Sequence, residues 1–343
     1  MALKLQCCFF CICLVIFLSL GFWASQIEAR VLAEMSMVDR HEQWMAQYGR
    51  VYKDAAEKEK RFLIFKNNVE RIELFNRPGG NNYTLSINLF ADLSDEEFKA
   101  TRTGYRSLTG QRPSLNTEFR YNNVTDVPTS MDWREKGAVT PIKDQGSCGC
   151  CWAFTAVAAM EGITQLKTGN LISLSEQELV DCDNTNKGCN GGNIDKAFQF
   201  IVQNRGLTTE SNYPYEEVDG TCSEEKAAEH AAMITGYEDV PSSNEQELLT
   251  AVANQPVSVA IDGSGHPFKY YSSGIFTGEC GTNLDHAVTL IGYGVNEKGI
   301  KYWLVKNSWG TSWGENGYMR IQRDVAAKEG LCGLAMEPSY PTA

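Results

Sequence analysis

The sequence predicts an α+β protein with two lobes, preceded by a helical N-terminal segment. Apolar residues recur at helical spacing from residue 35 to about residue 100, and again from 152 to 203. From about residue 255 the pattern changes to β-rich runs separated by Gly and Asn. A helical half followed by a β half is typical of α+β architecture, and the cleft between two lobes is a usual binding site.

The first 24 residues have the pattern of a secretory signal peptide. Lys4 precedes a long apolar run that ends near Ala24, a small residue suited to cleavage. The run is also near the shortest length that spans a bilayer, so an uncleaved anchor is the alternative. A cleaved signal predicts a vacuolar, lysosomal or extracellular protein without membrane contact.

Residues 25–126 are expected to form a helical part, at about 38–97, followed by a linker. Arg77-Pro78-Gly79-Gly80 ends the main helix, residues 83–90 alternate as in a strand, and residues 101–126 lack periodicity and are interpreted as linker. One helix face carries residues spaced by three or four: Glu57, Arg61, Phe65, Asn68, Ile72 and Asn76.

After Val127 the sequence predicts three helices and then four strands. The first helix covers residues 152–167 and ends at Gly169, the second opens with a capping box at residues 175–178, and the third covers 193–203. The strands are expected at residues 257–261, 287–293, 302–305 and 318–322.

The charge of the chain is acidic and unevenly distributed. The 343 residues carry a formal net charge of −12, which argues against a nucleic acid as partner. The part from Val127 on holds 15 of the 31 basic and 28 of the 43 acidic residues, so it carries −13 and the preceding part carries +1. The two parts are therefore expected to attract each other.

Eight cysteines remain once the signal segment is excluded. The secretory route makes disulfides possible, and an even count allows four bridges, or three bridges and two free thiols. Cys150 and Cys151 are adjacent in the sequence, and adjacent cysteines are poor candidates for a disulfide with each other. The eight are Cys148, Cys150, Cys151, Cys182, Cys189, Cys222, Cys280 and Cys332.

The segment from Gln145 to Phe154 places thiols at a Gly-rich turn where a helical pattern begins. A helix N-terminus lowers the pKa of a thiol and favours the reactive thiolate. Three cysteines lie within four residues, so the local pattern alone does not select a nucleophile.

A thiol nucleophile needs a partner base, and histidine serves that role. His41 falls in the early helical region, while His230 and His266 lie in polar stretches and are expected at the surface. His286 opens an apolar run, where a histidine taken alone is more often structural. Downstream, Asn307 offers an amide that can orient an imidazole, and Trp309 can shield that bond from water.

These residues resemble the three catalytic blocks of papain-like cysteine proteases, and the first block carries a signature known for that family. The His and Asn follow Cys151 by 135 and 156 residues. Upstream, the six-residue helix face matches the family's propeptide motif of the cathepsin-L-like branch. Asn88, Phe90 and Asp92 match its second propeptide motif, although Ser86 replaces the usual Gly. The chain is most similar to plant vacuolar members, including senescence-associated ones.

The resemblance implies a two-lobe fold, with a helical left lobe and a β-barrel-like right lobe, behind an inhibitory propeptide. It makes Cys151 the nucleophile, His286 its imidazolium partner, Asn307 the orienting amide and Gln145 an oxyanion-hole donor. The implied substrate-binding residues are Gly191, Gly192, Asn193, Ile194, Ala260, Leu284, Asp285, Trp309 and Glu337. The implied disulfides are Cys148–Cys189, Cys182–Cys222 and Cys280–Cys332.

Two positions leave alternatives open. Cys150 stands where the family usually has Ser or Ala, either as a small buried residue or as a second thiol prone to oxidation. Glu337 either lies on the floor of the main specificity pocket or points to solvent. An apolar pocket selects a bulky hydrophobic P2 residue, two positions before the scissile bond, and a carboxylate there would also accept a basic one.

The resemblance also implies a zymogen with residues 127–343 as the endopeptidase domain. Acid would weaken the prosegment's attraction to the acidic peptidase part, so self-processing near Val127 is expected below about pH 5. Asn82 and Asn123 lie in glycosylation sequons of the prosegment. The expected partners are protein or peptide substrates, the chain's own propeptide and cystatin-type inhibitors, with a monomeric enzyme and no cofactor.

Two other classes are weighed against this hypothesis. A metal-binding module would use Cys148, Cys151, Cys182 and Cys189 as zinc ligands, but the spacing is irregular and leaves His286 unexplained. A catalytically dead binder usually lacks the nucleophile or the histidine, and both are present here.

Overall fold

The computed structural model describes residues 36–108, 119–124 and 126–343. The expected signal peptide lies outside the described residues. The chain divides into two compact units, one up to Asn68 and one from Val69 to Ala343, which are described separately.

The described part of the N-terminal unit has an aromatic core. Helix α2 (Met37–Gln47) begins at Ser36, whose side chain accepts a hydrogen bond from Asp39 N. Helix α3 (Ala55–Phe75) supplies Phe65, which is fully buried, with its ring centroid 5.4 Å from that of Trp44 and 5.0 Å from that of His41. His41 is therefore part of a packed core, and the predicted helix around the six-residue motif is confirmed.

The second unit begins within α3, which ends one residue before Asn76. The Asn76 side chain bonds both the N–H and the C=O of Leu85, so this motif residue joins the helix end to β1 (Tyr83–Leu85). The strand is shorter than predicted, because Asn88 accepts from Phe90 N and turns the chain. Helix α4 (Asp95–Arg102) follows behind a complete capping box of Ser94 and Glu97.

The predicted linker starts too early. Residues 101 and 102 belong to α4, and the side chains of Arg102 and Tyr105 are buried. Residues 119–121 also make specific contacts, described below. In the sequence, polar residues without periodicity are typical of a linker. An extended segment that packs against another part of the protein also lacks helical or strand periodicity, so the two cannot be distinguished by pattern.

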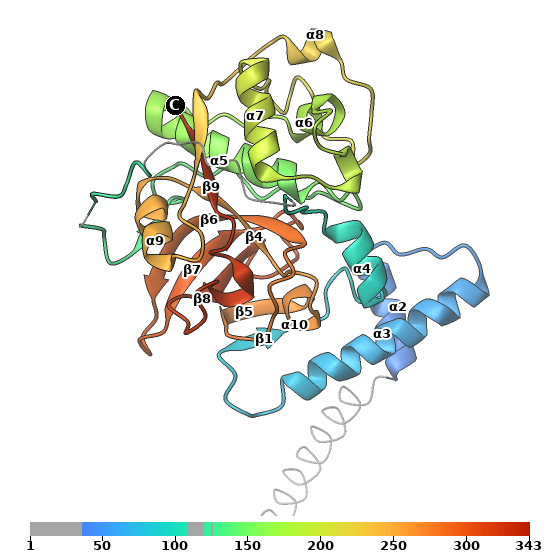
Figure 1. The fold of residues 1–343 in the computed structure, drawn as a ribbon. Helices are drawn as coiled ribbons and strands as arrows, with labels where there is room; N and C mark the ends of the chain where they lie inside the picture. The colour runs from blue at the N-terminus through green and yellow to red at the C-terminus, as the bar shows by residue number, and fades with distance from the viewer. Residues whose placement is uncertain (1–35, 109–118, 125) are drawn as a thin grey trace, which may run out of the picture. The chain divides into compact units, whose positions relative to one another are not determined.

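The helical lobe is built around α5 (Cys151–Thr168), most of whose residues are buried (Figure 1). Gly169 ends this helix with φ 78°, as predicted. Asn193 caps α7 (Ile194–Asn204) with its side chain. Only half of the predicted capping box forms at α6 (Glu176–Cys182): Ser175 accepts from Glu178 N, but the Glu178 carboxylate binds Asn204 and Thr208 instead.

The β lobe is one sheet with strand order β1-β5-β8-β7-β6-β4-β9-β3, and β2 also pairs with β6. This path does not close, so the lobe is an open sheet rather than the barrel-like structure expected. All four predicted strands form. Their observed bounds are β4 (Val257–Ile261), β6 (His286–Val295), β7 (Lys301–Lys306) and β8 (Tyr318–Gln322).

Several short elements were not predicted, because each is set by tertiary contacts rather than by a long periodic pattern. They include β5, which pairs parallel to β8, and α10, which precedes β5 directly. The short elements are β2 (Met131–Asp132), η1 (Gly188–Asn190), α8 (Glu224–Ala227), β3 (Gly236–Asp239), α9 (Glu245–Asn254), α10 (His266–Lys269), β5 (Tyr271–Phe276), η2 (Leu331–Gly333) and β9 (Ser339–Thr342).

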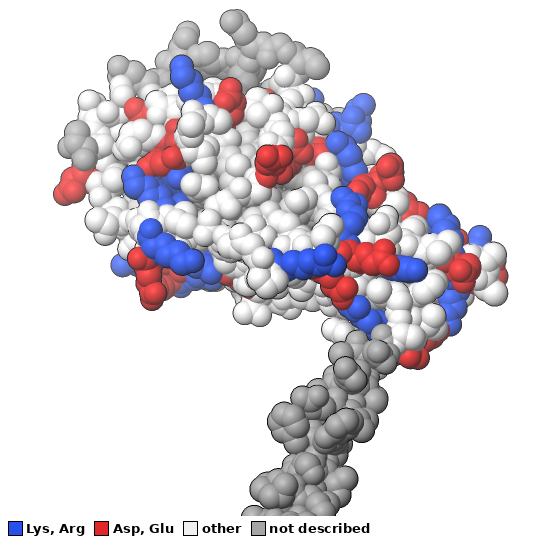
Figure 2. All heavy atoms as spheres, turned by 90° about the horizontal axis from the view of Figure 1, so that it is seen from below, with Lys and Arg blue, Asp and Glu red and all other residues white. Residues whose placement is uncertain are grey.

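The surface carries charges of both signs. On the face seen in Figure 2, basic and acidic side chains alternate among uncharged ones. Among the described residues, no helix has the length and apolar character needed to cross a bilayer.

Candidate active site between helix α5 and strand β6

Cys151 is the first residue of α5 and is fully buried. The preceding loop turns at Gly146, with φ 57°, and is held from both sides. Gln145 N donates to Ser308 O at 2.9 Å, and the Tyr215 hydroxyl donates to Gln145 O at 2.7 Å. The thiol therefore lies at a helix N-terminus in a fixed loop, as the local sequence pattern predicts.

The β lobe carries a stacked and hydrogen-bonded group that consists of His286, Asn307 and Trp309. His286 opens β6, and its Nε2 lies 2.8 Å from Asn307 Oδ1. The indole of Trp309 stacks on the imidazole with ring centroids 4.4 Å apart. All three side chains are buried, so the His–Asn bond is shielded from water. His286 Nδ1 makes no hydrogen bond to the described residues.

An extended segment of the expected propeptide, residues 103–106, which follows α4 and is called the prosegment strand, lies over the loop that carries Cys151. Gly104 N and Tyr105 N both donate to Asp285 O at 2.9 Å, beside the histidine. On the other side, Gly192 N donates to Gly104 O, and Arg106 N donates to Gly192 O. This parallel bridge uses both backbone groups of Gly192, one of the residues expected to bind substrate.

Gly104 is required by the close approach of two backbones. A Cβ added at Gly104 would overlap the carbonyl oxygen of Gly149, in the loop that leads to Cys151. Gly149 is tight for the same reason, because a Cβ there would lie 2.6 Å from Cys189 O and 2.8 Å from Thr103 O. Two glycines facing each other thus let this segment lie directly on the loop before Cys151.

The covered site holds its thiol and imidazole in uncharged forms. Burial raises the pKa of Cys151 to about 12, although nearby backbone N–H groups such as that of Ala287 oppose the shift. Burial lowers the pKa of His286 to about 4, against the bond from Asn307. The thiolate–imidazolium pair implied by the family resemblance is therefore disfavoured while the prosegment strand is in place.

Gln145 also makes contacts with the prosegment. Its Nε2 donates to Arg102 O at 3.2 Å and to Cys148 O at 2.9 Å, while Ser308 Oγ donates to its Oε1 at 2.7 Å. Trp309 Nε1 donates to the same Arg102 carbonyl at 3.1 Å. The amide expected to stabilise an oxyanion is thus occupied by a prosegment carbonyl.

Tyr105 is buried against residues of the expected specificity pocket. Its ring belongs to the same buried cluster as Ile194, Ala260 and Leu284. Its hydroxyl donates to Glu337 Oε2 and accepts from Asn193 Nδ2. Of the two positions weighed for Glu337, the structure favours the one that faces the pocket.

Gly191 and Asp285 flank this pocket. Gly191 has φ 102°, a conformation that favours glycine, and its N–H donates to Gly188 O. The Asp285 carboxylate accepts from Gly263 N at 2.9 Å and pairs with Lys99 of α4 at 2.9 Å.

The cysteines pair as the family resemblance implies, in the bonds Cys148–Cys189, Cys182–Cys222 and Cys280–Cys332. Three of the four zinc ligands weighed from sequence are consumed by these bonds, and no metal-binding cluster occurs in the part of the chain that the structure describes. Cys150 is fully buried, and its sulfur lies 3.0 Å from the Tyr215 hydroxyl. Burial raises its pKa well above the usual value, which describes an inert thiol.

An aromatic platform beside the site anchors the prosegment. Phe90 and Phe98 pack edge-on against Trp309, with ring centroids 5.6 and 5.1 Å away. Beneath them lies Lys269, a fully buried lysine whose Nζ donates to Leu93 O at 2.7 Å. Burial lowers the pKa of Lys269 to about 8.

His266, expected at the surface, is buried at the start of the same short helix α10. Only 8% of it is exposed, and its Nε2 has no hydrogen-bond partner among the described residues. Its ring lies 4.7 Å from that of Tyr270. Burial, with a smaller effect of the Arg71 charge, lowers its pKa to about 4. The surface prediction was wrong because the prosegment covers a stretch that is polar in sequence; His230 is exposed as predicted.

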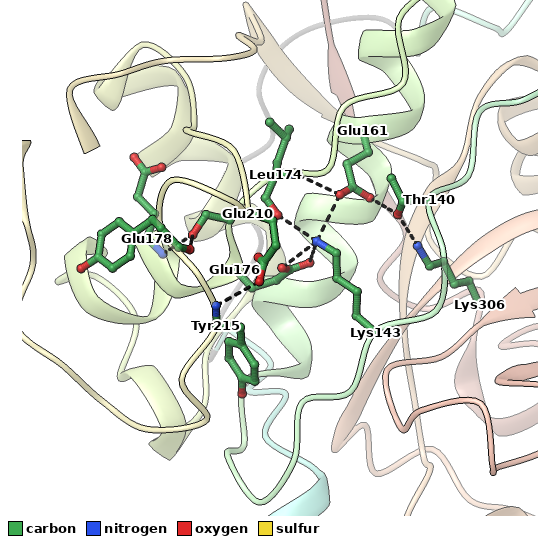
Figure 3. Close-up of polar contacts among 11 residues, drawn as sticks. Thr140, Lys143, Glu161, Leu174, Glu176, Glu178, Glu210, Tyr215 and Lys306 are labelled. Carbon is green, nitrogen blue, oxygen red and sulfur yellow. Dashed lines mark hydrogen bonds and ion pairs between the residues drawn. The ribbon is translucent and has the colours of Figure 1, made fainter. Parts of the chain in front are cut away.

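A charge network of mostly buried side chains joins Lys143, Glu161, Glu176 and, through Thr140, Lys306 (Figure 3). Lys143 Nζ contacts Glu176 at 2.8 Å and Glu161 at 3.2 Å. Glu161 accepts from Thr140, which in turn accepts from Lys306 Nζ at 2.7 Å. The network therefore links α5 and α6 to the end of β7, one residue before Asn307.

Two carboxyl groups of α6, those of Glu176 and Glu178, resist ionisation. Burial raises the pKa of Glu176 to about 8, and the charge of Glu161 adds to the shift against the opposing effect of Lys143. Burial raises the pKa of Glu178 to about 7. For Lys143 burial acts to lower the pKa, but the two carboxylates outweigh it and the pKa is raised.

Comparison with known proteins identifies the family. Residues 127–342 match the papain family cysteine protease domain, and residues 41–98 match the cathepsin propeptide inhibitor domain (I29). The chain belongs to the papain family of cysteine proteases. Because the chain also carries the propeptide domain, it is the zymogen of this protease. The two matches confirm the family expected from the sequence blocks.

Its relatives include plant proteases and solved precursors. The senescence-specific cysteine protease SAG12 of Arabidopsis thaliana is 59% identical over 315 residues, covering 90% of this chain and 91% of the relative. The proform of Amb a 11, a ragweed pollen cysteine protease, has a TM-score of 0.84 at 44% identity and covers 90% of this chain and 95% of its own. Recombinant stem bromelain precursor has a TM-score of 0.83 at 49% identity, covering 89% and 98%.

Sequence reasoning missed the residues that cover the site. Gly104 and Tyr105 fall inside the supposed linker, and Tyr215 and Lys269 carry no motif. The adjacent Gly104-Tyr105 pair after a helix end was the one available signal, since a glycine permits close backbone approach and an aromatic seeks a pocket.

Proposed function

We propose that this zymogen yields an endopeptidase in which Cys151 is the nucleophile. The thiolate attacks the scissile carbonyl carbon, and the resulting oxyanion is stabilised by the Gln145 amide and the Cys151 N–H. His286 gives its proton to the leaving amine as the C–N bond breaks, and water then hydrolyses the acyl-enzyme with His286 as base. The observation that carries the proposal is the buried His286–Asn307 bond under Trp309, beside a thiol at a helix start.

Inhibition follows from what the prosegment strand occupies. The carbonyl of Arg102, just before this strand, accepts a hydrogen bond from Gln145 Nε2. The strand itself lies across the nucleophile loop at Gly104 and places Tyr105 against the residues of the specificity pocket. Removal of the strand would return water to the thiol and imidazole. Their pKa values would then move back toward each other, which favours the reactive ion pair.

The pocket supports a preference for a bulky hydrophobic P2 residue, with a basic one also accepted. Tyr105 presents an aromatic ring to the apolar wall and a hydroxyl to Glu337, so a side chain with an apolar stem and a polar tip fits both. We expect Glu337→Ala to lower cleavage of substrates with Arg at P2 more than those with Phe or Leu. An unchanged ratio of kcat/KM values would reject the basic preference.

Acid-triggered removal of the propeptide is supported by the buried histidine of α10. The groups facing His266 are Arg71 and Asp95 of the prosegment and Lys269 of its own helix. Separation of the prosegment would expose His266 and raise its pKa toward the ordinary value near 6.5. Proton uptake between about pH 6.5 and 4 therefore favours separation.

The proposed setting is the secretory route, with the vacuole or lysosome as the compartment that supplies acid. Glycans at Asn82 and Asn123 would be lost with the prosegment, and both residues are exposed. Release of the active form is expected near Val127, where the papain-family match begins.

Covalent labelling tests the proposal directly. A peptidyl epoxide should label Cys151 only after incubation of the purified precursor at pH 4.5, and N-terminal sequencing should then place the new terminus near Val127. The matched controls are Cys151→Ser, which should neither label nor process, and Cys150→Ser, which should do both. Labelling of Cys150, or none after complete processing, would refute the assignment.

A further inference from the structure

A second part of the prosegment binds the β lobe through a short motif, Phe119-Arg120-Tyr121. Arg120 Nε and Nη2 donate to Glu238 Oε1 at 2.9 and 2.7 Å. The Tyr121 hydroxyl donates to Gln255 Oε1 at 3.0 Å. Two turns follow, in which Asn122 N donates to Phe119 O and Val124 N donates to Tyr121 O. These residues are as specifically held as the prosegment strand.

The surface that receives this motif is preformed on two paired strands. Glu238 of β3 is directly opposite Tyr340 of β9, and the Tyr340 hydroxyl donates to Glu238 Oε2 at 2.6 Å. The Tyr340 ring contacts both aromatic residues of the motif, with ring centroids 5.5 Å from Tyr121 and 6.3 Å from Phe119. The Glu238 carboxylate, held by Tyr340 and flanked by its ring, is complementary to Arg120, which lies between two aromatic residues in the sequence.

The chain is also held just after the expected processing junction. The Tyr293 hydroxyl donates to Pro128 O at 2.9 Å, and residues 131–132 pair with β6 at Tyr293 and Gly292. Tyr293 is seven residues along β6 from His286, which is about 23 Å at the rise of an extended strand. The junction near Val127 is therefore anchored on both sides, well away from the catalytic histidine.

We propose that Glu238, Gln255 and Tyr340 form a second docking site, separate from the cleft, whose occupant is the Phe119-Arg120-Tyr121 segment of this chain. Occupation of the site holds the junction at Val127 against the β lobe and protects it from proteases. The protective role of this site rests on the proposed processing near Val127. The binding of the segment to the site does not depend on it.

This site should keep its occupant in acid. The Arg120 bond, the Tyr340 hydroxyl and the Arg120 charge together lower the pKa of Glu238, although burial opposes them. The ion pair is therefore retained as the pH falls to about 5, when the prosegment strand is expected to loosen. Acid alone should therefore leave this segment docked, whereas it is expected to loosen the segment in the cleft.

Limited proteolysis of the full-length Cys151→Ala precursor tests the docking site without any self-processing. A chymotrypsin-like protease cuts after aromatic residues, and so reports on Phe119 and Tyr121 even when Arg120 is replaced. Arg120→Ala and Glu238→Gln should each speed cleavage at these positions about tenfold, because cleavage tracks the population of the undocked segment. The charge exchange Arg120→Glu with Glu238→Arg should bring the rate back to within about threefold of the parent.

Arg134→Ala is the matched control, because it removes another Arg–carboxylate pair, to Asp132, on the same lobe. It should leave the cleavage rate unchanged. Hydrogen exchange of the amides of residues 119–124 gives a second readout on the intact precursor, and protection there should fall in Arg120→Ala. Equal cleavage rates and equal protection in all variants would overturn the proposal, even if the precursor processes itself normally.

Discussion

Two buried regions of this protease respond to acid in opposite directions. The first is the platform under the prosegment, where His266 and Lys269 of α10 lie beneath α4. The second is the interior of the helical lobe, where Glu176 and Glu178 of α6 adjoin the Lys143 network (Figure 3). Both are desolvated, but one buries bases and the other buries acids, so the same proton acts on them with opposite sign.

The platform loses stability in acid. His266 has a pKa near 4 when covered, below its ordinary value near 6.5, so the separated state binds more protons between these values. Docking is therefore strongest above about pH 6.5 and weakens as the pH falls through 4.

The interior gains stability in acid. Glu178 has a pKa near 7 in the folded state, above an ordinary value near 4.3, so the folded state binds more protons between these values. Its contribution is fully present below about pH 4.3 and is lost as the pH rises through 7. The proposed release of the prosegment in acid is thus compatible with a peptidase part that remains folded.

The largest expected effect comes from breaking the interior network at its centre. Glu161→Ala removes the acceptor shared by Thr140, Lys143 and Leu174 N, and leaves two buried ammonium groups with one carboxylate. We expect a loss of about 3–5 kcal/mol in the free energy of unfolding, measured by urea denaturation of the Cys151→Ala precursor. Lys301→Met, which removes an exposed pair to Asp324, should cost no more than about 1 kcal/mol.

The pH response of the interior is tested by Glu178→Gln. Asn204 Nδ2 and Thr208 N donate to different oxygens of Glu178, so the single amide oxygen of Gln keeps only one of these bonds at any pH, and the group no longer titrates. Between pH 5 and 8 the parent should lose about 2 kcal/mol more stability than the variant. Parallel stability curves over that range would show that Glu178 does not titrate near 7.

The pH response of the platform is tested by His266→Gln. Removing the titrating imidazole should reduce the ratio of processing rates at pH 4.5 and 6.5 by up to about fortyfold, the factor that follows from a pKa near 4 when His266 is covered and near 6.5 when it is exposed. His230→Gln, at an exposed histidine, should leave this ratio unchanged. An unchanged ratio in both variants would show that His266 is not the group whose protonation triggers processing.

The smallest effect is expected at Cys150. Serine can keep the contact to the Tyr215 hydroxyl, so stability should change by less than about 1 kcal/mol. Since the thiol is fully buried, dilute peroxide should inactivate the processed Cys150→Ser variant and parent at the same rate. Slower inactivation of the variant would revive the oxidation hypothesis.

Much of this fold could be predicted from the sequence, because the apolar periodicity of a long helix or strand indicates which of its residues are buried. Helix α5 with its Gly169 end and the strands β4 and β8 were predicted to within a residue. The surface assignment of His266 and the linker assignment of Tyr105 were wrong for one shared reason. Each is buried by a segment distant in the chain, and such burial leaves no periodic trace in the local sequence.

The sequence by itself determined the family, the positions of Cys151, His286 and Asn307, and the helical propeptide, because each rests on residue types at fixed spacing. Only the tertiary structure decided which way Glu337 faces, which segment contacts Gln145 and the pocket residues, and which ionisable groups are buried. These depend on contacts across more than a hundred residues, and desolvation by a distant segment sets a pKa that no local pattern encodes.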